Sequence, residues 1–194
     1  MMTTRNSRRL SLLILFVLLF SLLLPGSVLA QSAKVQVVLF YSPFCGHCQQ
    51  VIAEEIPPIV QAYNTSYIWS YYGEPPDEET GQLPSIVAYE GNTLQILYID
   101  TTTQIGGDLY LAAVERFQIM PEDQAVPTLI IGEELLIGGV DIPNQLPIMV
   151  DAWLSEGGLP WPDISGLEEV VTALVPYPDQ VQESPTPEAD ATQD

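Results

Sequence analysis

Two cysteines and one histidine, the only ones in 194 residues, lie together in the stretch Cys45-Gly46-His47-Cys48. Two thiols with two residues between them can form one disulfide with each other. A disulfide that closes so short a loop constrains the unfolded chain least, so stabilisation is a poor reason for it. Reversible redox exchange is a better reason. The sequence therefore predicts a redox-active Cys45–Cys48 disulfide that works without any other cofactor.

The chemistry of such a pair depends on the thiolate, which is the reacting form of cysteine. A helix that begins at or just after Cys45 would place free backbone N–H groups and the positive end of the helix dipole beside this sulfur. His47 can add a positive charge or a hydrogen bond. These effects lower the pKa of Cys45 and predict that Cys45 attacks, while the more buried Cys48 resolves the mixed disulfide.

Other interpretations of the same residues stay open. His47 could be an exposed turn residue without a role. Structural zinc usually takes four ligands, and this chain offers two sulfurs and one imidazole, so no metal site is predicted. A copper-binding module outside the cytoplasm that uses Cys45, His47 and Cys48 is the alternative function.

Elements on both sides of the dithiol can position it. Residues 34–41 are β-branched and aromatic and predict a buried strand that ends at Ser42-Pro43. A helix should follow to Ile56, where Pro57-Pro58 stops or kinks it, and residues 59–63 can add another turn.

The sequence after residue 92 predicts further strands and helices. Residues 94–99 form a strand, and a helix follows with Asp108 as its N-cap. Residues 126–139 form a hairpin, and a helix capped by Asn144 ends at Gly157-Gly158. Residues 165–174 form a short helix. The order β-α-β-α-β-β-α predicts an α/β fold with a central mixed sheet flanked by helices.

Residues 64–92 are predicted as an irregular insertion after the first helix. The aromatic side chains there are expected to pack the insertion onto the core, with a substrate groove as the alternative. Asn64-Thr65-Ser66 matches a glycosylation sequon, which matters only in a eukaryotic secretory pathway.

The two ends of the chain are predicted to lie outside the domain, which spans residues 31–175. Residues 1–30 have three arginines, an apolar run and a small-residue cleavage site, the pattern of a signal peptide. An uncleaved membrane anchor is the alternative. Residues 176–194 are acidic and proline-rich and are expected to be disordered.

The predicted export signal and the net charge indicate where the protein works and which partners it can have. Without the first 30 residues, Lys34 and Arg116 face 25 acidic residues, a net charge of −23. Such a surface repels nucleic acid, which is excluded as a partner. The protein is expected outside the cytoplasm, secreted, periplasmic or at the cell surface, where a disulfide is stable.

Two motifs carry a resemblance to a known family. Residues 41–48, Tyr-Ser-Pro-Phe-Cys-Gly-His-Cys, resemble the active site of the thioredoxin superfamily, and the CGHC core is the form found in protein disulfide isomerases. Val126-Pro127-Thr128 is similar to that superfamily's cis-proline loop. The resemblance covers residues 35–157. The whole pattern is also similar to thioredoxin-like domains that accompany bacterial vitamin K epoxide reductase homologues.

The resemblance implies roles for individual residues. Val126–Pro127 would be a cis peptide bond, and Val126, Pro127 and Thr128 would bind an extended substrate segment. Phe44 and Gly46 would shape the active-site turn. Many family members carry a buried acid six residues before the first cysteine, whereas this chain has Leu39 there.

The expected function is an exported thiol–disulfide oxidoreductase. Its substrates would be exported cysteine-containing proteins, and a membrane homologue of vitamin K epoxide reductase could be its redox partner. The CGHC sequence favours oxidation or isomerisation, and reduction is the alternative direction.

Overall fold

A computed structural model of the chain describes residues 33–77, 83–177 and 182–183. The predicted signal peptide, the middle of the predicted insertion and most of the predicted disordered tail lie outside these residues. All the elements given below belong to one compact unit.

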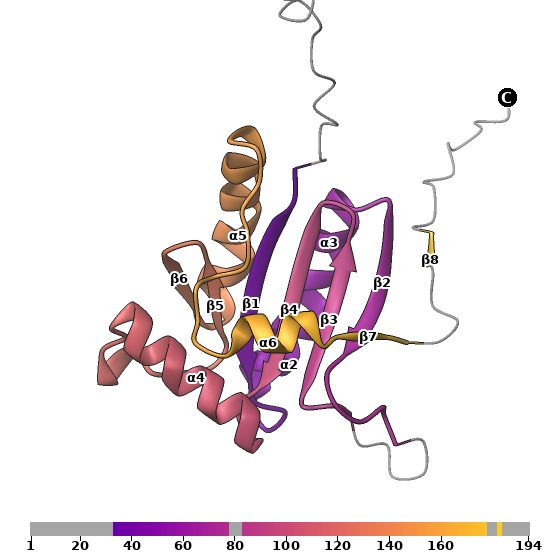
Figure 1. The fold of residues 1–194 in the computed structure, drawn as a ribbon. Helices are drawn as coiled ribbons and strands as arrows, with labels where there is room; N and C mark the ends of the chain where they lie inside the picture. Colours follow the sequence, from indigo (N-terminus) through magenta and orange to yellow (C-terminus); the bar gives the residue numbers. More distant parts are fainter. Residues whose placement is uncertain (1–32, 78–82, 178–181, 184–194) are drawn as a thin grey trace, which may run out of the picture. The chain divides into compact units, whose positions relative to one another are not determined.

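The centre of the fold is a mixed β-sheet with the strand order β6-β5-β1-β4-β3-β2-β7 (Figure 1). Strand β1 pairs in parallel with β4 and antiparallel with β5. The strands are β1 (Val35–Tyr41), β2 (Ser66–Tyr71), β3 (Ile86–Gly91), β4 (Leu94–Asp100), β5 (Thr128–Ile131), β6 (Glu134–Ile137) and β7 (Val175–Pro176), and β8 (Gln182–Glu183) also pairs with β2. The predicted α/β class with a central mixed sheet is confirmed.

Helices cover both faces of the sheet centre. They are α2 (Gly46–Gln50), η1 (Val51–Glu55), α3 (Ile56–Tyr63), α4 (Gln104–Phe117), η2 (Pro121–Asp123), α5 (Gly138–Ser155) and α6 (Leu167–Thr172). Alternate residues of β1 point to opposite faces, as a strand requires. Val37 and Leu39 pack with η1, α3 and α5, while Val38 and Phe40 pack with α4 and α6. Figure 1 shows α6 in front of the sheet and α3 behind it.

The helical chain continues through Pro57 and Pro58, so of the predicted stop or kink the stop is wrong, and the helix changes from π to α geometry just before the prolines. Residues 51–55 form a π-helix in which the N–H of Ile56 donates to the carbonyl of Val51, five residues earlier. The two prolines then occupy the first turn of α3, where a missing N–H costs no hydrogen bond. The widened turn lets the chain continue to Tyr63, and residues 59–63 do extend the helix as predicted.

Both predicted N-caps are wrong. Helix α4 is capped by Thr103, whose Oγ1 accepts a hydrogen bond from the N–H of Gly106 at 3.2 Å, and Asp108 lies inside the helix. Helix α5 starts at Gly138, directly after β6, so Asn144 is also inside a helix. Burial of Ile142, four residues ahead of Leu146 on the same face, favours this earlier start.

The insertion is not irregular in its described part, because it forms β2 and β3 and extends the sheet. Asn64 fixes the start of this extension. Its amide nitrogen donates to the carbonyls of Val60 and Leu94, and its amide oxygen accepts from the N–H groups of Thr93 and Leu94. Asn64 is only 2% exposed, so the sequon asparagine serves the fold and is not accessible for glycosylation in the folded chain.

The end of the domain also adds to the sheet. The prediction of disorder from residue 176 is wrong for the residues that the structure describes there. Pro176 pairs with Ser70, and the N–H of Tyr177 donates to the carbonyl of Trp69 at 2.9 Å.

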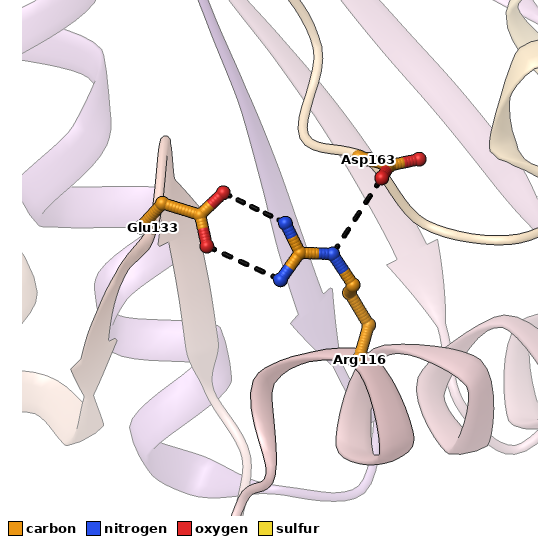
Figure 2. Close-up of polar contacts among 3 residues, drawn as sticks. All are labelled: Arg116, Glu133 and Asp163. Carbon is orange, nitrogen blue, oxygen red and sulfur yellow. Dashed lines mark hydrogen bonds and ion pairs between the residues drawn. The ribbon is translucent and has the colours of Figure 1, made fainter.

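Arg116 on α4 forms ion pairs with the turn between β5 and β6 and with the loop before α6 (Figure 2). Its guanidinium donates to both carboxylate oxygens of Glu133 in the turn between β5 and β6, at 2.8 and 3.2 Å. Its Nε lies 3.6 Å from a carboxylate oxygen of Asp163 in the loop before α6. Because these groups are exposed, the arrangement orients the segments more than it stabilises them.

Candidate active site

The dithiol lies where β1 ends and α2 begins. Cys45 is the N-cap of α2, with extended backbone angles, φ −96° and ψ 116°. A short turn brings it there, in which the N–H of Cys45 donates to the carbonyl of Ser42 at 3.1 Å. Cys45 is partly exposed, whereas Cys48, inside the first turn, is fully buried. Both are free thiols, so the structure represents the reduced form.

The environment of Cys45 favours its thiolate. Burial acts to raise the pKa of Cys45, but the Cys48 thiol and the backbone N–H groups of Cys48 and His47 together lower it below the ordinary value. Free N–H groups at a helix N-terminus stabilise negative charge. Cys45 is therefore the better nucleophile of the pair.

Cys48 has the opposite character. Burial raises the pKa of Cys48 to about 12, and although the backbone of Ser42 acts to lower it, the nearby Cys45 sulfur raises it further. A buried sulfur that keeps its proton cannot attack an external disulfide. It can react only with a sulfur brought to Cys45, which suits a resolving thiol.

The loop at Val126 and Pro127 packs directly on the dithiol. The Val126–Pro127 bond is cis, as the family resemblance implied. The Cys45 thiol donates to the carbonyl of Val126, with 3.4 Å between sulfur and oxygen. Thr128 starts β5 opposite Phe40 of β1, and this pairing brings a loop 81 residues away to Cys45.

The side chain of Thr128 holds this loop and faces no open space. Thr128 is fully buried, and its Oγ1 donates to the carbonyl of Ala125 at 2.6 Å. The backbone N–H of Val126 donates to no group in the described part of the chain. Of the three predicted substrate-binding residues, Val126 contacts Cys45 through its carbonyl, Pro127 forms the cis bond that follows it, and Thr128 supports the loop from the sheet.

The remaining predicted site residues lie on the exposed side. His47 is exposed, and the imidazole lies near the start of α5, where a β-carbon added to Gly139 would be 3.8 Å from its Cδ2. Within residues 33–77, 83–177 and 182–183, the imidazole makes no hydrogen bond, so the contribution of His47 to the Cys45 thiolate comes from its backbone N–H. Phe44 is 87% exposed, and a β-carbon on Gly46 would contact nothing within 4 Å.

Sequence reasoning missed Tyr41. Burial, Asp100 and Cys48, in that order, raise the pKa of Tyr41 to about 12, so its phenol lies within electrostatic range of the buried thiol. The signal was available, because Tyr41 is two residues after Leu39 in a strand and shares its face. Leu39 itself is fully buried and apolar, so Tyr41 supplies a polar group near Cys48 on this face of β1.

Metal binding gains no support from the geometry. Among the described residues, no group of three or more histidine, cysteine, aspartate or glutamate side chains is placed to hold a metal ion. The copper-binding alternative therefore stays without a structural observation in its favour.

Comparisons with known proteins give no assignment. No family model, no curated protein and no solved structure matches the chain. Within the described residues, the helices lack the length and apolarity that crossing a membrane requires.

Proposed function

We propose that the protein is an exported thiol–disulfide oxidoreductase of the thioredoxin type. One observation carries the proposal, the contrast between two neighbouring thiols. Cys45 is accessible, has a lowered pKa and lies against the Val126 carbonyl, while Cys48 is buried with a pKa of about 12. This asymmetry is what a nucleophilic and a resolving cysteine need.

The reaction balances with the dithiol alone. The Cys45 thiolate attacks one sulfur of a substrate disulfide, and a Cys45–substrate mixed disulfide forms as the other substrate sulfur leaves as a thiolate. The Cys48 sulfur then attacks the Cys45 sulfur, and the Cys48 proton passes, directly or through water, to the substrate sulfur that leaves. This closes the Cys45–Cys48 disulfide and releases the second substrate thiol. Two electrons pass from the protein to the substrate, and the reverse sequence oxidises a substrate dithiol.

The surface around Cys45 suits an extended, apolar protein segment. The N–H of Val126, which bonds to no group among the described residues, can donate to a substrate carbonyl, as in the addition of a short β-strand. Phe44 and Val140 expose apolar side chains, 87% and 70% accessible, on the turn before Cys45 and at the start of α5. Exported proteins with unpaired or mispaired cysteines present such segments before they fold.

The order of the elements around the dithiol also supports the proposal of a thioredoxin-type protein. In both the resemblance and the structure, a strand leads into the dithiol helix and a cis-proline loop opens a following hairpin. The hairpin is β5–β6, and α5 follows it. Strands β2, β3 and β7 would be additions to that core.

Location and partners follow from the resemblance and the charge. The chain would work outside the cytoplasm, and a membrane homologue of vitamin K epoxide reductase would be a suitable partner to exchange electrons with the dithiol. With 25 acidic and 5 basic residues, the protein would not bind nucleic acid.

The direction of exchange can be measured as a reduction potential against glutathione. A value near −120 mV would indicate an oxidase and one near −270 mV a reductase. The lowered pKa of Cys45 stabilises the reduced form, so we expect a potential above that of a reductase.

Exchange with a model disulfide peptide tests the proposal itself. Wild-type protein should reduce the peptide stoichiometrically, and Cys45→Ser should not react, while both unfold at the same temperature because the substitution is nearly isosteric. Full activity in Cys45→Ser would overturn the proposal.

A further inference from the structure

A cavity lies near the dithiol, but neither cysteine lines it. The cavity measures about 540 Å³ and opens between α3 and the sheet extension on the face that carries η1 and α5. Its volume falls in the range of roughly 300–1,000 Å³ that small-molecule sites occupy. The lining residues are Tyr41, Ile52, Ile56, Pro57, Val60, Gln61, Tyr67, Trp69, Leu83, Val87, Tyr89, Tyr98 and Tyr177.

The lining carries no charge in a protein that is otherwise strongly acidic. None of the lining residues is Asp, Glu, Lys or Arg, although the chain has 25 acidic residues. An anion would meet the negative field of the protein without a basic partner. The negative field and the aromatic faces would attract a cation, but a cation in the cavity would lose its hydration without any carboxylate in the lining to pair with, which costs more. The cavity therefore selects for neutral molecules.

The aromatic wall is rigid before any ligand arrives. The rings of Tyr67 and Tyr89 stack with 4.7 Å between their centroids, and Trp69 meets the edge of Tyr89 at 5.2 Å. Trp69 also contacts Tyr98 at 5.9 Å. Tyr67 and Trp69 remain partly exposed on this wall, so apolar and aromatic groups can pack against them without any rearrangement.

One polar atom in the wall lacks a partner. Tyr89 is only 3% exposed, and its hydroxyl makes no hydrogen bond of normal length and angle to any group that the structure describes. The Asn64 amide lies close enough to act on the pKa of Tyr89 but is not placed to bond its hydroxyl. A buried hydroxyl without a partner is costly, and buried tyrosine hydroxyls normally have one. The neighbouring Asn64 already uses both its amide atoms on backbone groups. A ligand in the cavity could supply the missing hydrogen bond.

From these observations we infer that the cavity binds a neutral, mainly apolar small molecule that carries a hydrogen-bonding group for the hydroxyl of Tyr89. The site goes beyond the proposed exchange reaction. It approaches the dithiol at Tyr41 and Ile52, but Cys45 and Cys48 do not line it. Ligand binding in the cavity should therefore persist when Cys45 or Cys48 is replaced. Loss of disulfide exchange alone would refute only the proposed function, and absence of ligand binding alone would refute only this inference.

Two related probes test the inference. N-phenyl-1-naphthylamine is neutral, mainly apolar and has one N–H, and its fluorescence rises in an apolar site. The dye 8-anilinonaphthalene-1-sulfonate has the same rings with an added negative charge. We expect the neutral probe to bind the purified chain with one site at least tenfold more tightly than the sulfonate. Equal affinities would overturn the selection for neutral ligands.

A pair of variants locates the binding. Gln61 and Ala62 are both exposed and adjacent on α3, but only Gln61 lines the cavity. Gln61→Trp should fill the mouth and weaken binding of the neutral probe at least tenfold, whereas Ala62→Trp should leave it unchanged. Equal binding by both variants would place the probe elsewhere and overturn the inference.

Two further measurements complete the test. Tyr89→Phe should lower the affinity for the neutral probe about fivefold, as expected for one lost hydrogen bond, without lowering the melting temperature of the free protein. Unchanged affinity would contradict the role of this hydroxyl. Light scattering should give the same mass for wild type and Gln61→Trp, and a dimer that dissociates in the variant would show that a second copy covers the cavity instead.

Discussion

The two parts of the sheet are built from different residues. In the central strands β1, β4 and β5 nearly every residue is buried, mostly aliphatic, and covered by helices on both faces. In β2 the first four residues are only partly buried, and Tyr67 and Trp69 face a cavity. The centre therefore holds the dithiol and its cis-proline loop rigidly, while the extension leaves space for a ligand.

This difference suggests a separation of tasks. Thiol exchange needs one accessible sulfur and one buried sulfur at fixed positions, which a closely packed centre provides. Ligand binding needs unfilled apolar volume, which the extension provides. Changes in one part should therefore leave the other part working.

The largest effect is expected at Cys45. Cys45→Ser should abolish exchange with a disulfide peptide, because no other accessible thiol remains, yet it should bind N-phenyl-1-naphthylamine like the wild type. The matched variant Gln61→Trp should show the reverse pattern, with normal exchange and lost probe binding. Parallel loss of both activities in either variant would contradict the separation.

The next largest effect is expected at Asn64, which joins the extension to the centre. Asn64→Ala removes four hydrogen bonds to backbone groups and should lower the free energy of unfolding by about 3 kcal/mol. Asn92→Ala is the comparison. Asn92 is exposed, and the N–H groups of Thr65 and Ser66 that donate to its amide oxygen can turn to water when it is removed, so this change should cost only about 1 kcal/mol. Urea unfolding measures both. Equal losses would mean that Asn64 does not anchor the extension.

A smaller effect concerns the link between the two thiols. The Cys48 thiol helps to lower the pKa of Cys45 by donating a hydrogen bond. Cys48→Ala removes the donor and should raise the Cys45 pKa, whereas Cys48→Ser keeps a donor and should raise it less. The ultraviolet absorbance of the thiolate, followed against pH, gives both values. Identical pKa values in the two variants would exclude this hydrogen bond as a cause.

The smallest effect is expected at His47. The backbone N–H of His47 stabilises the Cys45 thiolate, and the imidazole makes no hydrogen bond in the part of the chain that the structure describes. His47→Ala should therefore leave the Cys45 pKa nearly unchanged. The same absorbance titration applies. A rise in the Cys45 pKa as large as that in Cys48→Ala would show that the imidazole acts on the thiolate, as the sequence alone suggested.

Much of the centre could be predicted because its signals are local. The apolar run of β1, the spacing of the two cysteines and the hairpin after Pro127 each depend on neighbouring residues. The helix caps were missed for the opposite reason. Thr103 and Asp108 are both suitable N-caps by residue type. Which of them caps α4 depends on where β4 ends, and the end of β4 is set by its pairing with distant strands.

The extension could not be predicted for a related reason. Tyr67, Trp69 and Tyr89 face a cavity, and their strands gain stability mainly from pairing across long sequence distances, as between Trp69 and Tyr89. The role of Asn64 is similar, since its partners include Leu94, 30 residues away. Tyr41, by contrast, could have been found from the alternation of β1.

Alkylation of the reduced protein across a range of pH tests the contrast between the two thiols most directly. A lowered pKa means that Cys45 becomes a thiolate at lower pH, so iodoacetamide should modify it with a midpoint below the ordinary value of about 8.5. Cys48, with its pKa raised to about 12, should stay unmodified throughout the neutral range. Mass spectrometry of the digested protein assigns each label. Labelling of Cys45 alone at neutral pH is the predicted result, and equal labelling of both cysteines, or earlier labelling of Cys48, would contradict the account.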